Sequence, residues 1–185
     1  MTTPAARLLS IGHGTASEVE LLDRLVSANV RRLIDVRTAP GSSRHPHLDR
    51  EQLERWLPAA GVDYRWDPRL GGFRRPPKDS PDVVWENSSF RGYAAHLRTD
   101  AAHAGLRDLL ADALAGPTAF LCSETVWWRC HRRLVADALV LLHEQRVDHL
   151  MPGGVTPHVP TAGARRVGDD LVYDDVAAAR AAVRT

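Results

Sequence analysis

The sequence predicts an α/β domain with a mostly parallel sheet flanked by helices. Short apolar runs alternate along the chain with longer segments in which apolar residues recur every three or four positions. This alternation is typical of parallel sheets, because parallel neighbours need a crossover connection that is usually a helix. The 185 residues fit one domain with a sizeable core. We therefore expect a single domain over residues 1–185, in which the chain after Pro152, including the tail 159–185, reads as loop with a short hairpin near 167–175.

Five short segments have the composition of strands. They are apolar in the middle and are bounded by glycine, proline or charged residues, as buried strands of a parallel sheet usually are. In chain order they are residues 7–13, 31–37, 61–66, 117–122 and 147–151.

Helical spacing separates these strands. Ser17 is followed three residues later by Glu20, a capping-box pattern, and Asp49 and Gln52 repeat it before a second apolar stripe. Gly116 is a typical helix C-cap residue. The expected helices cover residues 17–30, the segment after Asp49, and residues 90–98, 103–116 and 130–145.

Residues 67–89 are rich in proline, glycine and arginine and predict a long loop. Structureless loops of that length inside a domain are usually functional or disordered. Its Gly71-Gly72 pair leaves room for a ligand or a turn beside the backbone. Arg74 follows two positions later, and Tyr93 in the next helix is expected either to stack on a ligand or to pack in the core.

Composition excludes several functional classes. The net charge of +1 does not call for nucleic acid or an anionic membrane as partner, although Lys78 is the only lysine among 24 basic residues. No apolar run approaches the 18 residues of a transmembrane helix, and the N-terminus lacks a signal-peptide core. Two cysteines do not form a disulfide scaffold, so we expect a cytoplasmic protein. The oligomeric state does not follow from the sequence.

Chemistry is expected at the carboxyl ends of the strands, where open α/β sheets bind ligands. Polar or reactive residues follow four of the five expected strands. They are His13 after the first strand, Asp35 and Arg37 after the second, Cys122 and Glu124 after the fourth, and His149 after the fifth.

The stretch LCSETVWWRCHRRLV contains both cysteines. Cys130 and His131 precede Leu134 and Val135 by four positions, so both should point from the start of the helix toward the sheet. A helix N-terminus and nearby arginines favour a thiolate at Cys130, whereas desolvation at the end of an apolar strand should raise the pKa of Cys122. Buried cysteines that only pack are an alternative. Zinc is another, held by Cys122, Cys130 and His131, although close cysteine pairs are missing.

At these residues the chain resembles the domain of unknown function 488 family. The motifs that carry the resemblance occur in order between Leu9 and His158: SIGHG, LIDVRTAPGSSRHP, LGGFRR, the Phe90 and Tyr93 pair, LCSE with CHR, and VDHLMPGG. Gly12-His13-Gly14-Thr15 fits the family's usual hydroxyl residue and histidine only loosely. The resemblance implies the fold, the place of the site and a suspected enzyme, but it implies no particular reaction.

Rhodanese-type sulfurtransferases are a weaker likeness. LIDVR is similar to their early aspartate strand, and Cys122 ends a later strand as their persulfide cysteine does. Here SETVWW follows the cysteine without a glycine, and Glu124 would disfavour a thiolate at Cys122.

The sequence therefore predicts an enzyme of unassigned reaction that acts on a small anionic, phosphorylated or nucleotide-like ligand. The anion would be held by Arg37, Arg44 and Arg132, with Arg74, Gly71, Gly72 and Tyr93 beside it. Acid, base and nucleophile would come from Glu124, His131, Cys130, Cys122, His13 and Asp35. No cofactor is predicted. The alternatives are rhodanese-like sulfur transfer at Cys122 and a nucleic-acid-binding module without catalysis.

Overall fold

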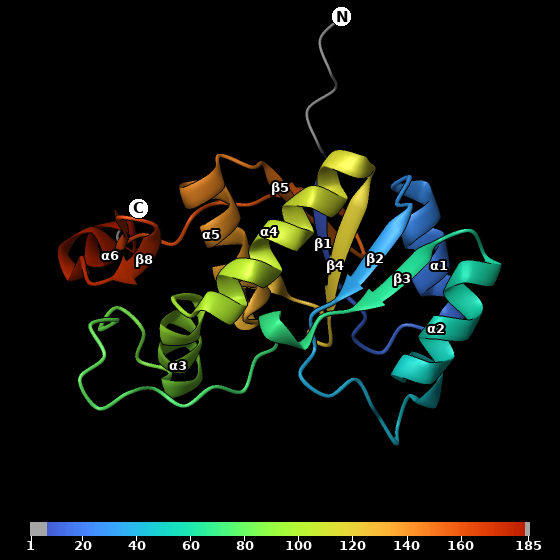
Figure 1. Ribbon diagram of the computed structural model, residues 1–185, viewed down its shortest axis with the longest axis horizontal. Helices are drawn as coiled ribbons and strands as arrows, with labels where there is room; N and C mark the ends of the chain where they lie inside the picture. The colour runs from blue at the N-terminus through green and yellow to red at the C-terminus, as the bar shows by residue number, and fades with distance from the viewer. Residues whose placement is uncertain (1–6, 184–185) are drawn as a thin grey trace, which may run out of the picture.

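A six-stranded sheet forms the centre of the protein, whose computed structural model describes residues 7–183 (Figure 1). The strand order is β3-β2-β4-β1-β5-β6. The first five strands in chain order are parallel to their neighbours, and β6 pairs antiparallel with β5 at one edge. The strands are β1 (Leu8–Gly12), β2 (Arg32–Asp35), β3 (Asp63–Trp66), β4 (Thr118–Cys122), β5 (Val147–Met151) and β6 (Gly154–Pro157).

Helices cover both faces of this sheet and bury two separate apolar clusters. One cluster receives leucines from α1 (Glu18–Ser27) and α2 (Arg50–Ala59). The other receives apolar residues from α3 (Ser88–Leu97), α4 (Asp100–Ala115) and α5 (Arg132–His143). Short 3-10 helices η1 (Pro46–Leu48), η2 (Pro68–Leu70) and η3 (Trp127–Arg129) lie in the connections. No helix within residues 7–183 is long and apolar enough to cross a membrane.

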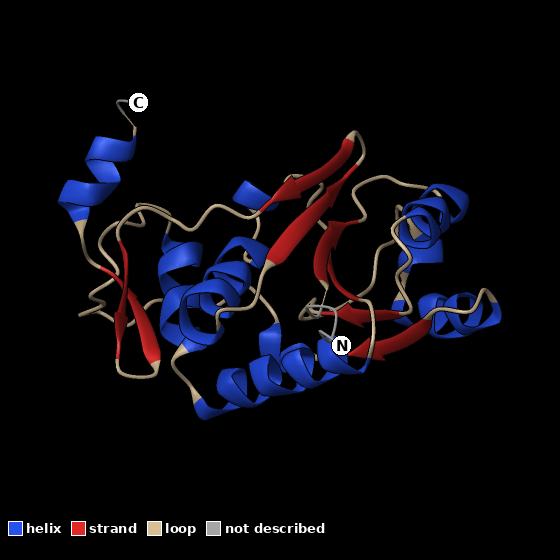
Figure 2. Cartoon of the chain, turned by 90° about the horizontal axis from the view of Figure 1, so that it is seen from above, coloured by secondary structure: helices blue, strands red, loops and turns tan. Residues whose placement is uncertain are grey.

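A hairpin of β7 (Ala164–Val167) and β8 (Asp170–Tyr173) forms a second small sheet. It packs on α3 and α5 through buried Leu171 and Tyr173. With the final helix α6 (Val176–Ala182), it occupies the end of the molecule away from α1 and α2 (Figure 2). The tail therefore adds its own residues to the core on the α5 side of the sheet.

The predicted fold class is confirmed, and the capping box of Ser17 and Glu20 begins α1 as expected. Asp49 precedes α2, but its carboxylate accepts from the backbone of Ser42 instead of capping that helix. The expected helix start at residue 130 is wrong: α5 begins at Arg132, and Cys130 ends the preceding 3-10 helix. Strand β6 and helix α6 were not predicted.

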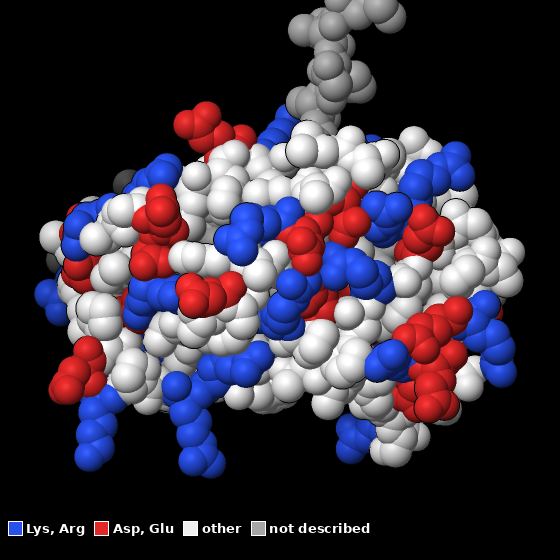
Figure 3. Space-filling model, viewed as in Figure 1, with Lys and Arg blue, Asp and Glu red and all other residues white. Residues whose placement is uncertain are grey.

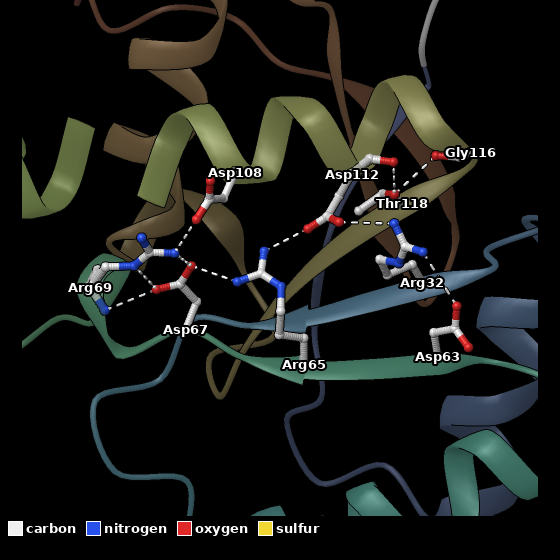
Figure 4. Close-up of polar contacts among 9 residues, drawn as sticks. All are labelled: Arg32, Asp63, Arg65, Asp67, Arg69, Asp108, Asp112, Gly116 and Thr118. Atoms are coloured by element: carbon white, nitrogen blue, oxygen red, sulfur yellow. Dashed lines mark hydrogen bonds and ion pairs between the residues drawn. The ribbon is translucent and has the colours of Figure 1, made fainter. Parts of the chain in front are cut away.

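Many arginine side chains form ion pairs with aspartate or glutamate. Asp112 of α4 accepts from Arg32 at 2.9 Å and from Arg65 at 2.6 Å, which ties α4 to β2 and β3 (Figure 4). Arg69 pairs in the same way with Asp67 and Asp108. Basic and acidic side chains are interspersed over the face that α4 covers (Figure 3). This face is therefore not a uniformly basic surface.

Candidate functional site

A cavity of about 240 Å³ opens at the carboxyl ends of β2 and β4. Four parts of the chain meet there: the segment after β2, the loop before α3, the first turns of α3, and the segment from the end of β4 to α5. The lining residues are Arg37, Thr38, Ala39, Gly72, Phe73, Ser89, Phe90, Tyr93, Cys122, Ser123, Glu124, Arg129, Cys130 and His131. The cavity thus lies where an open α/β sheet is expected to bind ligands.

Both thiols and one imidazole meet at the floor of this cavity. His131 Nδ1 lies 3.7 Å from Cys122 Sγ and 3.8 Å from Cys130 Sγ. His131 Nε2 lies 3.2 Å from the carbonyl oxygen of Val36, which can only accept, so Nε2 carries a proton. Nδ1 therefore faces the two sulfur atoms, and it accepts from a thiol when the imidazole is neutral and donates to a thiolate when the imidazole is protonated.

Close packing holds the imidazole of His131 in this orientation. The Tyr93 ring lies 4.8 Å from it, centroid to centroid, and the Tyr93 hydroxyl donates to the carbonyl of Leu70 at 2.7 Å. On the other side, a Cβ atom added to Gly72 would lie 3.0 Å from His131 Nδ1. The loop can approach the imidazole this closely because Gly72 has no side chain.

The two thiols have opposite electrostatic tendencies. Burial alone would raise the pKa of Cys130, but hydrogen bonds from Cys122 and His131 and the charges of His131 and Arg132 outweigh it, and the pKa falls well below its usual value. The pKa of Cys122 is raised well above its usual value, first by its hydrogen bond to Cys130 and then by burial. The pair therefore favours a thiolate at Cys130. This thiolate accepts a hydrogen bond from the neutral thiol of Cys122.

Arg132 lies behind Cys130 and is fully buried, with 0% of its surface exposed. Its Nε donates to Cys130 Sγ at 3.4 Å and its Nη1 to Ser10 Oγ at 3.1 Å, while Nη2 donates to the backbone carbonyl of Glu124. Gly12 permits this last contact, because a Cβ there would overlap the same carbonyl and the guanidinium. Within residues 7–183 no carboxylate forms an ion pair with Arg132. Its charge is thus buried with the Cys130 sulfur as its partner.

Asp35 and Arg37 form a second polar cluster at the same edge. Arg37 Nε and Nη2 both donate to the Asp35 carboxylate, the latter at 2.5 Å, and the Tyr64 hydroxyl donates to it at 2.6 Å. Arg37 Nη1 lies 3.2 Å from His13 Nε2, and His13 Nδ1 lies 2.9 Å from the carbonyl of Gly14. Burial lowers the pKa of His13 to about 4, so this imidazole is neutral at pH 7. Asp35 thus uses both oxygens within the cluster.

The remaining predicted residues divide between the cavity and its surroundings. Glu124 lies in the lining with an exposed side chain. Arg44 is exposed and outside the lining, and Arg74 donates to the carbonyls of Gly71 and Pro68. Gly71 is packed against Thr38 beside the cavity.

Sequence reasoning missed two features of this region. Phe73 is 94% exposed at the cavity and has a backbone φ of +57°, an unusual value for a bulky residue. Ser10 lies buried inside β1, and His149, which was expected at the carboxyl end of its strand, lies buried in the middle of β5, next to His158 and Asp137. The sequence could have pointed to these residues, because each is a polar residue at a position of a strand or helix that is expected to face the core.

The donor atoms of Cys122, Cys130 and His131 all lie within 4.8 Å of one another. They are of the type that zinc prefers, and a histidine whose second nitrogen donates to a carbonyl is common beside metals. The guanidinium of Arg132, 3.4 Å from Cys130 Sγ, disfavours an additional cation at this place. The geometry thus permits a metal, while the local charge opposes it.

Comparison with known proteins assigns the chain to a family. No curated protein and no solved structure matches the chain. The family model described as the domain of unknown function DUF488 matches residues 18–139, which include β2, β4, both cysteines and His131. Because this match covers well over half of the chain, the protein belongs to the DUF488 family.

Proposed function

We propose that the protein is an enzyme whose nucleophile is the thiolate of Cys130 and whose substrate is a small anionic ligand bound in the cavity. One observation carries this proposal: the buried guanidinium of Arg132 donates to Cys130 Sγ at 3.4 Å and has no carboxylate partner among the described residues. An unpaired buried charge is costly, and a thiolate at Cys130 would compensate it. Reactive cysteines occur in such electropositive surroundings.

The neighbours of Cys130 suit the remaining chemical roles. His131 Nδ1 faces both sulfurs and can exchange a proton with either, as a general acid or base must. Cys122, whose pKa is raised, keeps its proton and can donate a hydrogen bond to the Cys130 thiolate. Glu124 is an exposed residue of the cavity lining. Reduced thiols at both positions suit a reducing cytoplasm.

The test of the nucleophile is the rate of iodoacetamide alkylation of each cysteine against pH, followed by peptide mass spectrometry. We expect a midpoint for Cys130 below the free-cysteine value of about 8.5 and one for Cys122 above it. A Cys130 midpoint at or above the free value would remove the basis of the proposal. Protection of both cysteines by zinc, reversed by a chelator, would replace it with a metal site. Persulfide formed from thiosulfate at Cys122 alone would replace it with sulfur transfer, which the raised pKa of Cys122 opposes.

Arg129 is the arginine in the lining that has no ion pair or side-chain hydrogen bond within residues 7–183. The side-chain N–H groups of Arg37 and Arg132, in contrast, donate hydrogen bonds to other residues of the protein. We therefore expect phosphate or sulfate to bind beside Arg129, where the guanidinium can form two parallel hydrogen bonds to an oxyanion.

Phosphate should raise the melting temperature of the parent protein, since a ligand that binds only the folded state stabilises it, with about 2–4 °C for each kcal/mol in a protein of this size. Arg129→Ala should abolish the rise, whereas Arg44→Ala, an exposed arginine outside the lining, should leave it intact. Differential scanning fluorimetry at constant ionic strength measures both. Equal responses of the two variants would argue against an anion in this cavity.

The alternative of a nucleic-acid-binding module receives less support. Basic and acidic side chains are interspersed over the face that α4 covers, and the net charge is +1 (Figure 3). Proteins that bind nucleic acid nonspecifically usually present a continuous basic surface.

A further inference from the structure

A chain of buried hydrogen bonds runs from Arg132, the first residue of α5, through Ser10 of β1 and His149 of β5 back to Asp137 of the same helix. Ser10 Oγ lies 2.7 Å from His149 Nδ1, His149 Nε2 lies 2.9 Å from His158 Nδ1, and His158 Nε2 lies 2.9 Å from Asp137 Oδ1. All four side chains are buried, with at most 8% of any one residue exposed. The chain starts at Ser10 Oγ, which accepts from Arg132 Nη1.

One proton arrangement satisfies every member of this chain when both imidazoles are neutral. The Asp137 carboxylate accepts, so His158 Nε2 carries its proton and His158 Nδ1 accepts from His149 Nε2. His149 Nδ1 then accepts the hydroxyl proton of Ser10, which leaves the Ser10 oxygen free to accept from Arg132. Every donor therefore points from Arg132 toward Asp137, an alignment in which hydrogen bonds strengthen one another.

The surroundings hold the His149 ring and the Asp137 carboxylate in place. Trp127 stacks on His149 at 4.1 Å and an interplanar angle of 6°. The Asp137 carboxylate also accepts from the backbone of Thr161 and the hydroxyl of Tyr173. Burial, with the nearby charge of Arg132 acting in the same direction, lowers the pKa of His149 to about 3, so this imidazole stays neutral at physiological pH. A protonated His149 would present a second donor to Ser10 and break the order of the chain.

We infer that Ser10, His149, His158 and Asp137 are positioning residues that hold the Arg132 guanidinium against the Cys130 sulfur. An arginine side chain has several rotatable bonds, and it stabilises a thiolate only while its donors point at the sulfur. Here one edge of the guanidinium is held by Ser10 and another by the carbonyl of Glu124, which directs Nε to Cys130. The inference rests on the proposed function and adds to it the residues that set the reactivity of the nucleophile.

Other groups also face Cys130 and remain when the chain is broken. They are Cys122 from β4, His131 before α5, and Tyr93 from α3, while Arg129 and Glu124 line the same cavity. Loss of Ser10 should therefore reduce the reactivity of Cys130 without abolishing it.

The experiment compares Ser10→Ala with Ser10→Thr, which keeps the hydroxyl on a strand residue. In Ser10→Ala we expect the alkylation midpoint of Cys130 to rise by about one pH unit and the rate below both midpoints to fall about tenfold. Ser10→Thr should react like the parent protein. His149→Leu removes the acceptor of the Ser10 proton and should shift the midpoint in the same direction, so it replaces Ser10→Ala should that variant fail to fold.

Leu25→Ala is the control for general destabilisation. Leu25 is fully buried on α1, on the opposite face of the sheet, so its loss should lower the melting temperature but leave the midpoint unchanged. A low midpoint in the parent protein that stays the same in Ser10→Ala and His149→Leu would overturn the positioning role and leave the proposed nucleophile in place. A midpoint at the free-cysteine value in the parent protein would overturn both.

Discussion

Replacing Asp35 with alanine is expected to lower the free energy of unfolding by about 3–5 kcal/mol, because it leaves a buried charge unpaired. The Asp35 carboxylate is 0% exposed and accepts from Arg37 through two side-chain nitrogens and from the Tyr64 hydroxyl. Without it, the guanidinium of Arg37 keeps only the carbonyl of Leu48 and the imidazole of His13 as partners. Neither of these groups carries a negative charge.

Urea unfolding measures this loss, and Glu54→Ala is the matched control. Glu54 also pairs with an arginine, Arg50, at 2.6 Å, but both side chains are 43% exposed. Removing such a surface carboxylate should cost no more than about 0.5 kcal/mol. The double replacement Asp35→Ala with Arg37→Met should recover part of the loss, since the unpaired charge is gone. A loss below about 1 kcal/mol in Asp35→Ala would mean that water or another acid compensates Arg37.

The strands and their polar ends were predictable because strong local patterns encode them. β1 and β4 are short segments that are mostly apolar, and Ser17 with Glu20 begins α1 as its spacing indicates. The meeting of Cys122, Cys130 and His131 followed from the same patterns, since parallel strands end at one edge of the sheet. Helix α5 starts two residues late because Trp127–Arg129 forms its own 3-10 turn, which periodicity does not separate from a helix.

The partners of the arginines were not predictable, because a sequence gives no distances between side chains far apart in the chain. Arg37 and Arg132 were expected to hold a ligand, yet Arg37 bonds to Asp35 and Arg132 to Ser10, 122 positions away. The buried chain through His149 was missed for the same reason. A polar residue at an inward position is visible in the sequence, but its partner is set by how β1, β5 and α5 pack.

Replacing Arg132 with methionine is expected to separate reactivity from stability. Methionine fills a similar volume without charge, so the thiolate of Cys130 loses its guanidinium and its midpoint of alkylation should rise toward or above the free value of about 8.5. At pH 7 the rate should fall by at least about tenfold. The folded protein also loses a buried cation that has no carboxylate partner, and replacing such a charge by an apolar side chain is often neutral or stabilising.

The pH dependence of unfolding gives an independent measure of the same charge pair. The pKa of Cys130 is lowered in the folded protein, so between that pKa and about 8.5 the unfolded chain binds one proton more than the folded one. The free energy of unfolding should therefore gain a positive contribution from Cys130 as the pH rises through this window, and lose it again as the pH falls through the folded pKa. In Arg132→Met the contribution should shrink, which urea titrations of both proteins at several pH values can measure. If Arg132→Met kept both the fast alkylation and the pH-dependent gain, the thiolate would depend on His131 and Cys122 alone. If the variant instead lost several kcal/mol at every pH, the guanidinium would be a structural group, and its contact with Cys130 would be incidental to function.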